Sequence, residues 1–257
     1  MSATVGIVFI GTSEYVNFFP RWKQCVDDNF LVDCNKTIFA FTDRIDEDFL
    51  KLPDTITCNV PHMPWPYVTL GRFRMMTDVK HLLSNMDYVF FLDADLFPVS
   101  KITLDEITAV DKPLTGVRHP GQTQNPYWQT FEVNPNSTAC VLKDVTVPQD
   151  FQPIYHQGCF WGGKAANIIT MIETLSQNVL DDMTRGVVAC WHDESHMNKY
   201  FLTRWDEVHT LHSGFAWPEG GDWSYLGDIG LEKRMLHAEK THDTFPRFPG
   251  KDGEGPI

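Results

Sequence analysis

The stretch Tyr88–Pro98 constrains the fold most, because five apolar residues, most of them β-forming, run directly into two carboxylates, Asp93 and Asp95. A continuous apolar run of this length is typical of a strand buried on both faces of a sheet. Alternate residues of an extended chain point the same way, so both carboxylates can face one cation. In open α/β sheets ligands bind beyond the carboxyl ends of the strands. The stretch therefore predicts a metal or phosphate site, with a capping or turn role for the aspartates as the alternative.

Strand-like and helix-like patterns alternate along the rest of the chain. Runs rich in β-branched and aromatic residues predict strands at residues 4–10, 37–41, 55–60, 88–92, 113–117 and 208–212. Apolar residues at helical spacing predict helices at residues 15–30, 69–84 and 164–180, with Thr69 as the cap of the second helix. The alternation favours a parallel or mostly parallel sheet covered by helices on both faces. A chain of 257 residues that is 42% hydrophobic fits one such α/β domain.

Three stretches interrupt this regular pattern. His119–Gln152 is polar, rich in Pro and Asn and without clear periodicity, and a loop of this length usually carries function or is mobile. Tyr155–Gly163 has three glycines among aromatic residues, which indicates either a backbone that approaches another group closely or a tight turn beside the core. The tail after Gly220 is rich in Gly, Asp and Lys and is predicted to be mobile.

Charge and glycine spacing argue against several kinds of site. A formal net charge of -13 with only 21 Lys and Arg residues disfavours a nucleic-acid surface, because phosphate neutralisation needs clustered positive charge. No Gly-x-Gly-x-x-Gly follows the first predicted strand, and no Gly-x-x-x-x-Gly-Lys-Ser/Thr occurs in the chain. Neither a dinucleotide fold nor a P-loop is therefore supported. If a diphosphate binds, a cation at Asp93 and Asp95 must do much of the neutralising.

The N-terminal residues, the apolar runs and the cysteines indicate in which cellular compartment the protein is expected. The first residues lack the basic region and cleavage site of a signal peptide, and no apolar run approaches the roughly 18 residues of a membrane span. The six cysteines show no Cys-x-x-Cys spacing, which favours reduced thiols over a disulfide framework or a zinc knuckle. We therefore expect a soluble, cytoplasmic protein without a membrane anchor.

A second concentration of polar residues lies between residues 187 and 202. His192 and His196 are one helical turn apart, which superficially resembles the His-Glu-x-x-His helix of zinc hydrolases. Asp193 stands where that pattern has its general-base Glu, and Glu194 comes one position late, which turns a side chain by about 100° on a helix. Zinc hydrolysis is therefore disfavoured, and either histidine can be a hydrogen-bonded structural residue.

The run Trp191–Leu202, which reads Trp-His-Asp-Glu-Ser-His-Met-Asn-Lys-Tyr-Phe-Leu, closely resembles a long motif of glycosyltransferase family 6. This is the family of the blood-group A and B transferases and of α-1,3-galactosyltransferase. The resemblance extends to Ile10–Tyr15, Phe41–Asp43, Trp65 with Arg72 seven residues later, Asp93–Asp95, His119–Gly121, Thr130–Glu132 and Phe160–Gly163. Together the segments cover most of the chain from residue 5 to about residue 220.

The resemblance implies a GT-A type nucleotide-sugar-binding fold, with a mixed, mostly parallel central sheet flanked by helices in a single domain. It implies retaining transfer of galactose or N-acetylgalactosamine from a UDP-sugar donor to the 3-hydroxyl of a galactose-terminated oligosaccharide acceptor. Residues 1–100 are expected to form mainly the nucleotide-binding half, residues 101–220 mainly the donor-sugar and acceptor half, and residues 221–257 a mobile C-terminal tail.

Roles follow from the resemblance, residue by residue. Asp93 and Asp95 match the pair that holds Mn²⁺, with Mg²⁺ as the alternative, against the UDP diphosphate. The remaining matches are Ile10, Thr12, Tyr15 and Arg72 for the nucleotide, Gln157, Gly158, Cys159 and Asp193 for the donor sugar, His119, Thr130 and Trp191 for the acceptor, and Lys240 and Arg247, loosely, for the tail over the diphosphate. Asp193 and Glu194 match the catalytic pair, with Glu194 as nucleophile or transition-state stabiliser.

Departures from the family pattern carry information too. The family's Tyr-Glu-Arg-Arg is Phe131–Asn134 here, so both arginines are missing. Both carboxylates at Asp93 and Asp95 are kept where some bacterial relatives have Asn, which predicts metal dependence. Cys159 is bulkier than the Gly common in N-acetylgalactosamine users and favours UDP-galactose, although Gln157 could reverse that preference. The missing anchor and stem point to a bacterial or viral catalytic domain in the bacterial or host cytosol.

Two other functions stay open on the residues alone. A sugar nucleotidyltransferase places metal carboxylates on a similar sheet, but it should show a basic, glycine-rich N-terminal loop, which Gly11–Glu14 does not provide. A non-catalytic carbohydrate-binding protein needs only Trp and Tyr side chains that stack on sugars. Such a protein does not require Glu194 beside an intact pair at Asp93 and Asp95.

Overall fold

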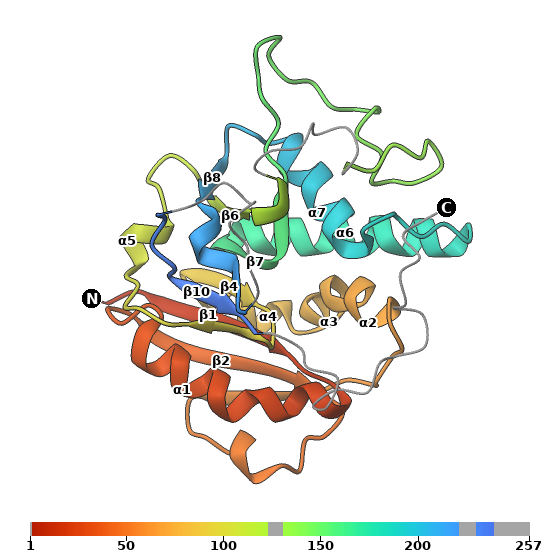
Figure 1. Cartoon of the computed structure of the whole chain (residues 1–257). Helices are drawn as coiled ribbons and strands as arrows, with labels where there is room; N and C mark the ends of the chain where they lie inside the picture. Colours follow the sequence, from red (N-terminus) through yellow and green to blue (C-terminus); the bar gives the residue numbers. More distant parts are fainter. Residues whose placement is uncertain (1, 123–130, 221–229, 239–257) are drawn as a thin grey trace.

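A seven-stranded sheet forms the centre of the computed structural model, which describes residues 2–122, 131–220 and 230–238 (Figure 1). In spatial order its strands are β3 (Thr55–Asn59), β2 (Asn35–Thr42), β1 (Thr4–Ile10), β4 (Tyr88–Leu92), β7 (His156–Lys164), β6 (Leu114–Arg118) and β8 (Val208–Leu211). Only β7 runs antiparallel to its neighbours. The predicted mixed, mostly parallel sheet is confirmed.

A second, three-stranded sheet and the helices complete the architecture. The small sheet contains β5 (Leu96–Pro98), β10 (Met235–His237) and β9 (Trp217–Pro218) in that order. The α-helices are α1 (Phe19–Asn29), α2 (Tyr67–Leu70), α3 (Arg72–Asp78), α4 (Lys80–Leu83), α5 (Leu104–Ile107), α6 (Ala165–Thr184) and α7 (His192–Leu202), and the 3-10 turns are η1 (Ser13–Phe18), η2 (Asp48–Leu50), η3 (Pro120–Gln122) and η5 (Ser213–Ala216). In the part of the chain just defined, no helix combines the length and the apolarity needed to cross a bilayer.

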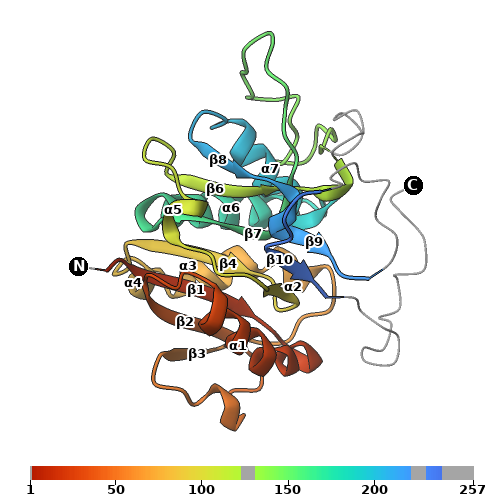
Figure 2. The ribbon, with the colours of Figure 1, turned by 60° about the vertical axis from the view of Figure 1, so that its left-hand side comes forward.

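The apolar run of β4 is buried on both faces of the central sheet. Phe90 and Leu92 belong to a core that also contains the apolar face of α1, whereas Val89 and Phe91 belong to a second core with α3, α6 and α7. Figures 1 and 2 show α3, α6 and α7 grouped on one side of the sheet and α1 on the other. Residues of one strand alternate between its faces, so two cores require apolar side chains at successive positions.

The antiparallel direction of β7 decides what lies beside the carboxyl end of β4. Leu92, the last residue of β4, pairs with Phe160, and the Asp93 backbone N–H donates to the Cys159 carbonyl at 2.9 Å. The first half of β7 is thereby placed next to the aspartate pair. A Cβ at Gly162 would stand 2.2 Å from the Phe90 ring, so the glycine-rich segment is a strand in close contact rather than a tight turn.

One predicted helix differs from the structure, and part of the predicted tail lies among the described residues. The helix predicted at residues 69–84 is divided into α2, α3 and α4, and Thr69 lies inside α2, where its hydroxyl donates to the Pro66 carbonyl at 2.8 Å rather than capping a helix. The tail predicted to be mobile contains β10, because Met235–His237 extend the small sheet. Thr130, Lys240 and Arg247 lie outside the described residues.

Asp182 of α6 anchors residues 131–155, which contain neither helix nor strand. Its carboxylate is 1% exposed and accepts hydrogen bonds from the Ser137 hydroxyl at 2.7 Å, the Thr138 backbone N–H at 2.8 Å and the Arg185 guanidinium at 2.6 Å. A buried carboxylate is stabilised when its oxygens are used in this way. The irregular segment is thereby fastened to a helix that packs on the core.

Replacing Asp182 by Ala should lower the free energy of unfolding by about 2–4 kcal/mol, because the Ser137 and Thr138 donors lose a buried acceptor. Asp181→Ala is the matched control, since Asp181 is exposed and its carboxylate accepts a hydrogen bond from Gln177 in the same helix; its effect should stay within about 0.5 kcal/mol. Urea denaturation measures both values. Equal, small effects would show that Asp182 does not anchor residues 131–155.

Candidate active site

The Arg72 guanidinium joins three segments that are far apart in the sequence. Nη1 lies 3.0 Å from Asp193 Oδ2 and donates to the Gly158 carbonyl at 3.0 Å, while Nη2 lies 3.4 Å from Asp93 Oδ1. The guanidinium carbon stands 4.5 Å from the centroid of the Phe91 ring. Arg72 begins α3 and is only 8% exposed. The planar fork of Arg suits such a site, because it offers several donors in fixed directions.

Asp93, Asp95 and His237 form a cluster suited to a metal ion. One ligand atom from each of the three residues lies within 4.8 Å of the other two. Residues 2–122, 131–220 and 230–238 contain no other group of three His, Cys, Asp or Glu side chains this close together. His237 Nε2 lies 3.0 Å from Asp95 Oδ1 and 4.0 Å from Asp93 Oδ2. Carboxylate oxygens and an imidazole nitrogen are common ligands of divalent first-row metals. The donor set therefore fits the predicted cation.

Glu194 lies on the first turn of α7, next to Asp193 in the sequence. Its Oε2 accepts a hydrogen bond of 2.6 Å from the Gly158 backbone N–H. Glu194 therefore contacts Gly158 directly, whereas Asp193 contacts Arg72, which donates to the Gly158 carbonyl. A Cβ at Gly158 would stand 3.3 Å from that oxygen. The glycine therefore allows the carboxylate to approach the strand closely.

Asn198 fixes α7 against β7, and the sequence analysis gave it no role. Its Oδ1 accepts from the His156 backbone N–H at 2.8 Å, and its Nδ2 donates to the His156 carbonyl at 2.8 Å and to the Glu194 carbonyl at 2.9 Å. The side chain thus pairs with the backbone of β7 as a neighbouring strand would. It sets the distance between Gly158 and the helix that carries Glu194.

Glu132 supports the turn that leads into α7, and it too had no predicted role. Its Oε2 accepts from the Cys190 backbone N–H at 2.6 Å and its Oε1 from the Asn134 backbone N–H at 2.7 Å. His192, two residues after Cys190, has φ of 52° and begins the helix. Left-handed backbone costs free energy in a residue with a Cβ, so the turn needs fixed contacts on its flank.

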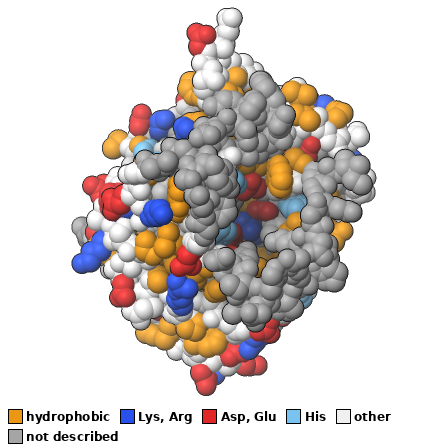
Figure 3. Space-filling model, viewed as in Figure 1, with side chains coloured by type: hydrophobic (Ala, Val, Ile, Leu, Met, Phe, Trp, Pro, Cys, Tyr) orange, Lys and Arg blue, Asp and Glu red, His pale blue; other side chains and the backbone are white. Residues whose placement is uncertain are grey.

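The predicted nucleotide residues lie at the same edge of the sheet as the aspartate pair. β1 and β4 are parallel neighbours, so Ile10 at the end of β1 and Asp93 after β4 share one edge. Thr12 is 4% exposed and its hydroxyl lies 3.0 Å from His62 Nδ1, and Tyr15 follows in η1. Figure 3 shows acidic, basic and histidine side chains gathered in a hollow near the middle of one face.

Two of the predicted acceptor residues, His119 and Trp191, lie at the end of β6 and at the start of α7. His119 directly follows β6, and its backbone N–H donates to the Tyr155 carbonyl at 2.9 Å. Trp191 precedes α7 and is 44% exposed, which leaves an aromatic face open to solvent. Burial lowers the pKa of His119 to about 4, so its imidazole is neutral at pH 7.

The two histidines of the zinc-hydrolase pattern do not converge. The His192 ring packs edge-on against Trp65, with centroids 4.6 Å apart. His196 is 1% exposed and its Nε2 lies 3.7 Å from Asp182 Oδ2. Neither belongs to a group of three metal-ligating side chains in the described part of the chain. Both are therefore packing residues of α7, in agreement with the structural alternative.

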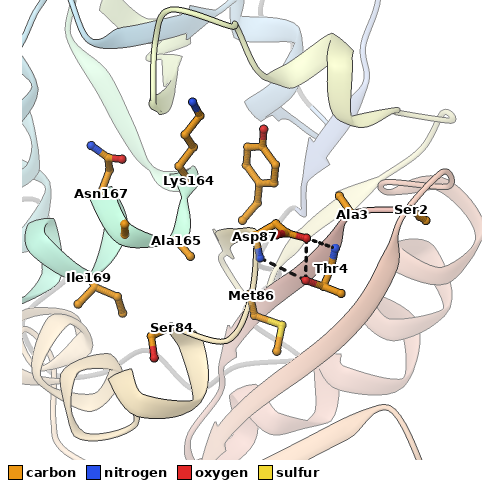
Figure 4. A pocket seen from close by; sticks show the side chains of 12 residues that line it. Ser2, Ala3, Thr4, Ser84, Met86, Asp87, Lys164, Ala165, Asn167 and Ile169 are labelled. Carbon is orange, nitrogen blue, oxygen red and sulfur yellow. Dashed lines mark hydrogen bonds between the residues drawn. The ribbon is translucent and has the colours of Figure 1, made fainter.

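A cavity of about 1020 Å³ lies at the opposite edge of the sheet (Figure 4). Its lining includes Thr4 at the start of β1, Asp87 and Tyr88 at the start of β4, and Lys164 at the end of β7. The Asp87 carboxylate accepts hydrogen bonds from the backbone N–H and the hydroxyl of Thr4, at 2.8 and 2.9 Å. None of the predicted site residues lines this cavity.

Burial shifts the protonation of the two α7 carboxylates. It raises the pKa of Glu194 to about 7, partly opposed by the hydrogen bond from Gly158 N–H. It raises the pKa of Asp193 to about 6, partly opposed by the positive charge of Arg72. Strongly shifted carboxylates beside one another are typical of catalytic sites. At neutral pH Asp193 is largely ionised and Glu194 is near its midpoint.

The raised pKa of Glu194 predicts a pH-dependent stability difference. A folded-state pKa above the ordinary value of 4.5 means that stability is greatest below that value and is lost as pH rises through about 7. Glu194→Gln keeps an acceptor for Gly158 N–H and removes this loss. Its free energy of unfolding relative to the parent should increase by about 1–2 kcal/mol between pH 5 and pH 8.

Urea denaturation at both pH values measures this difference, and Glu173→Gln on the exposed face of α6 is the control, expected to show no such trend. A pH-independent difference for Glu194→Gln would contradict the raised pKa.

Known proteins resemble this chain over most of its length. The sequence profile of glycosyltransferase family 6 matches residues 1–225. The O-antigen biosynthesis glycosyltransferase WbnI of Escherichia coli is 31% identical over 216 residues, covering 84% of this chain and 88% of that protein. The histo-blood group ABO system transferase 1 of Rattus norvegicus is 26% identical over 245 residues, covering 92% and 66%.

A third relative, globoside alpha-1,3-N-acetylgalactosaminyltransferase 1 of Homo sapiens, is 24% identical over 214 residues. The match covers 79% of this chain and 58% of the human protein, so this chain spans less than two thirds of the two mammalian relatives. The mixed α/β architecture, with its mostly parallel central sheet, agrees with these matches. The chain belongs to glycosyltransferase family 6.

Proposed function

We propose that this glycosyltransferase transfers galactose or N-acetylgalactosamine, with retention, from a UDP-sugar to the 3-hydroxyl of a galactoside, and that it requires Mn²⁺. The observation that carries the proposal is the Arg72 contact set, in which one guanidinium contacts Asp93 after β4 through Nη2 and Asp193 of α7 through Nη1. A sugar nucleotide needs both parts, one for the diphosphate and one for the sugar.

The leaving-group side of the site consists of Asp93, Asp95 and Arg72. When held by the two aspartates, the metal supplies Lewis-acid stabilisation of the charge that develops on UDP. Ile10, Thr12 and Tyr15 are proposed to contact the uridine from the same sheet edge. Arg72 contributes a fixed positive charge 3.4 Å from Asp93, and its neighbours prevent it from rotating away.

The sugar side of the site consists of Glu194 and Asp193. Retention requires either attack on the face that the leaving group departs from or two successive inversions. An ionised Glu194 can serve as nucleophile in the second case and stabilise an oxocarbenium-like transition state in the first. The Gly158 N–H holds one of its oxygens, which orients the carboxylate. Asp193, held by Arg72, is proposed to contact the donor sugar.

The donor and acceptor assignments rest on the residues around this pair. The start of β7, next to Asp93, contains Gln157, Gly158 and Cys159. The side-chain oxygen of Gln157, Oε1, is buried and has no hydrogen-bond partner among the described residues. It therefore offers an acceptor to a hydroxyl or amide N–H of the sugar. Cys159 favours UDP-galactose, while two relatives are named for blood-group and N-acetylgalactosaminyl transfer. The exposed Trp191, with His119, is proposed to receive the acceptor.

The assay that tests this function offers UDP-galactose and UDP-N-acetylgalactosamine separately, with a β-galactoside acceptor, and determines product linkage and anomeric configuration by NMR. Glu194→Gln should lower kcat by about 10³-fold, because the lost carboxylate acts in the transition state, and should leave UDP binding unchanged. Glu173→Gln serves as the control. Near-normal turnover by Glu194→Gln would exclude the assigned role, and galactoside binding without transfer by the parent would favour a binding protein.

Metal removal should abolish transfer, because no cation then lies between the negative charges of the diphosphate and those of Asp93 and Asp95. We expect EDTA-treated protein to lose at least about 10²-fold in kcat/KM and to regain activity on titration with Mn²⁺. Replacing both aspartates by Asn should give the same loss without recovery. Activity that is unchanged by EDTA, in protein shown to be free of metal by elemental analysis, would contradict metal dependence.

A further inference from the structure

His237 approaches the aspartate pair from a segment far along the chain. It lies 142 residues after Asp95, and its Nε2 is 3.0 Å from Asp95 Oδ1 and 4.0 Å from Asp93 Oδ2. The side chains of Asp93 and His237 are 27% and 23% exposed, whereas that of Asp95 is 3% exposed. The cluster therefore has a buried base and an accessible side on which a nucleotide can meet a bound ion.

The small sheet fixes the position of His237. β10 pairs with β5 so that His237 stands opposite Leu96, the residue after Asp95, and the Ala238 backbone N–H donates to the Asp95 carbonyl at 2.8 Å. Met235, two residues earlier, is fully buried in the core. A side chain held by a ladder on one side and by a buried anchor on the other is preorganised for binding.

Arg234 adds a second fastening at the other end of β10. Its Nε donates to the Ser100 hydroxyl at 2.7 Å, one Nη donates to Glu106 Oε1 at 2.8 Å, and its backbone N–H donates to the Gly214 carbonyl at 2.8 Å. These contacts hold the segment that carries His237 against α5 and η5. The approach of the imidazole to Asp93 and Asp95 thus follows from tertiary contacts along the whole strand.

We propose that His237 Nε2 is a third protein ligand of the metal and that it makes the site select Mn²⁺ and its first-row neighbours over Mg²⁺. Around an octahedral ion with bonds of about 2.1 Å, adjacent ligand atoms are about 3.0 Å apart and opposite ones about 4.2 Å. The separations of 3.0 and 4.0 Å from His237 Nε2 fall within that range. Mg²⁺ takes oxygen ligands, whereas first-row ions also accept imidazole nitrogen.

A neutral ligand also suits the charge of the site. Asp93 and Asp95 together balance a divalent ion, and a third carboxylate would add repulsion toward a diphosphate. An imidazole supplies a third bond without adding negative charge. Arg72, 3.4 Å from Asp93, adds further positive charge beside the cluster. The inference deepens the proposed function, on which it rests for the nucleotide that completes the coordination.

Metal binding without nucleotide tests the ligand directly. Mn²⁺ and Mg²⁺ dissociation constants are measured by isothermal titration for the parent and for His237→Ala, His237→Gln and His81→Gln, the last at an exposed position of α4. His237→Ala should weaken Mn²⁺ binding by about tenfold or more. His237→Gln, which replaces the nitrogen by an amide oxygen, should keep Mg²⁺ affinity within about threefold while Mn²⁺ affinity stays about tenfold lower. His81→Gln should match the parent.

Electron spin echo spectroscopy of the Mn²⁺ complex provides a second measurement, in which coupling to a histidine nitrogen should be present in the parent and in His81→Gln and absent in both His237 variants. Thermal unfolding without metal controls for loss of structure. Unchanged Mn²⁺ affinity in folded His237→Ala, or nitrogen coupling that survives there, would overturn the proposal. Failure of the parent to transfer sugar would overturn the proposed function instead, since metal titration without nucleotide does not depend on transfer.

Discussion

The contacts of the Arg72 guanidinium hold the site together. The carboxylates of Asp93, Asp193 and Glu194 lie close together in a partly buried region. Without a cation, placing them there would be strongly unfavourable. One buried Arg contacts two of them and the Gly158 carbonyl as well. The face of Phe91 beside the guanidinium restricts it further. A Lys could supply the charge but not the several fixed directions that these contacts use.

The direction of β7 gives this guanidinium its partners. Because β7 runs antiparallel to β4, its first residues lie at the carboxyl edge of the parallel strands, where Asp93 begins. A parallel strand at the same place would bring its last residues to that edge. Gly158 then serves two partners at once, donating its N–H to Glu194 and offering its carbonyl to Arg72. The first residues of β7 and the segment that begins at Asp93 are therefore parts of one hydrogen-bonded unit.

Buried polar side chains attach the irregular parts of the chain to this unit. Asp182 fastens residues 131–155 to α6, Glu132 supports the turn before α7, and Asn198 fixes α7 against β7. All three have low exposure, and their partners are mostly backbone groups. Backbone donors in a segment without helix or strand need such acceptors when they are buried. The precision of the Glu194 position thus depends on residues outside the pair Asp193 and Glu194.

Local patterns in the amino-acid sequence predict the alternating α/β architecture, the doubly buried strand β4, the aspartate pair at its end and the family. Each of these is written in a local pattern: a periodicity, an apolar run that ends in charge, or a long contiguous motif. The helix predicted at residues 69–84 was wrong in its continuity, because Gly71 and Val79 separate α2, α3 and α4.

The residues that come from distant parts of the chain to complete the site are visible in the folded structure alone. The sheet order placed Gly158 between Arg72 and Glu194, and the pairing of β10 with β5 placed His237 beside Asp93 and Asp95. Strand neighbours and side-chain contacts over 142 residues leave no periodic signal in a single sequence. They are set by which faces and edges can be buried together, and this is a property of the whole fold.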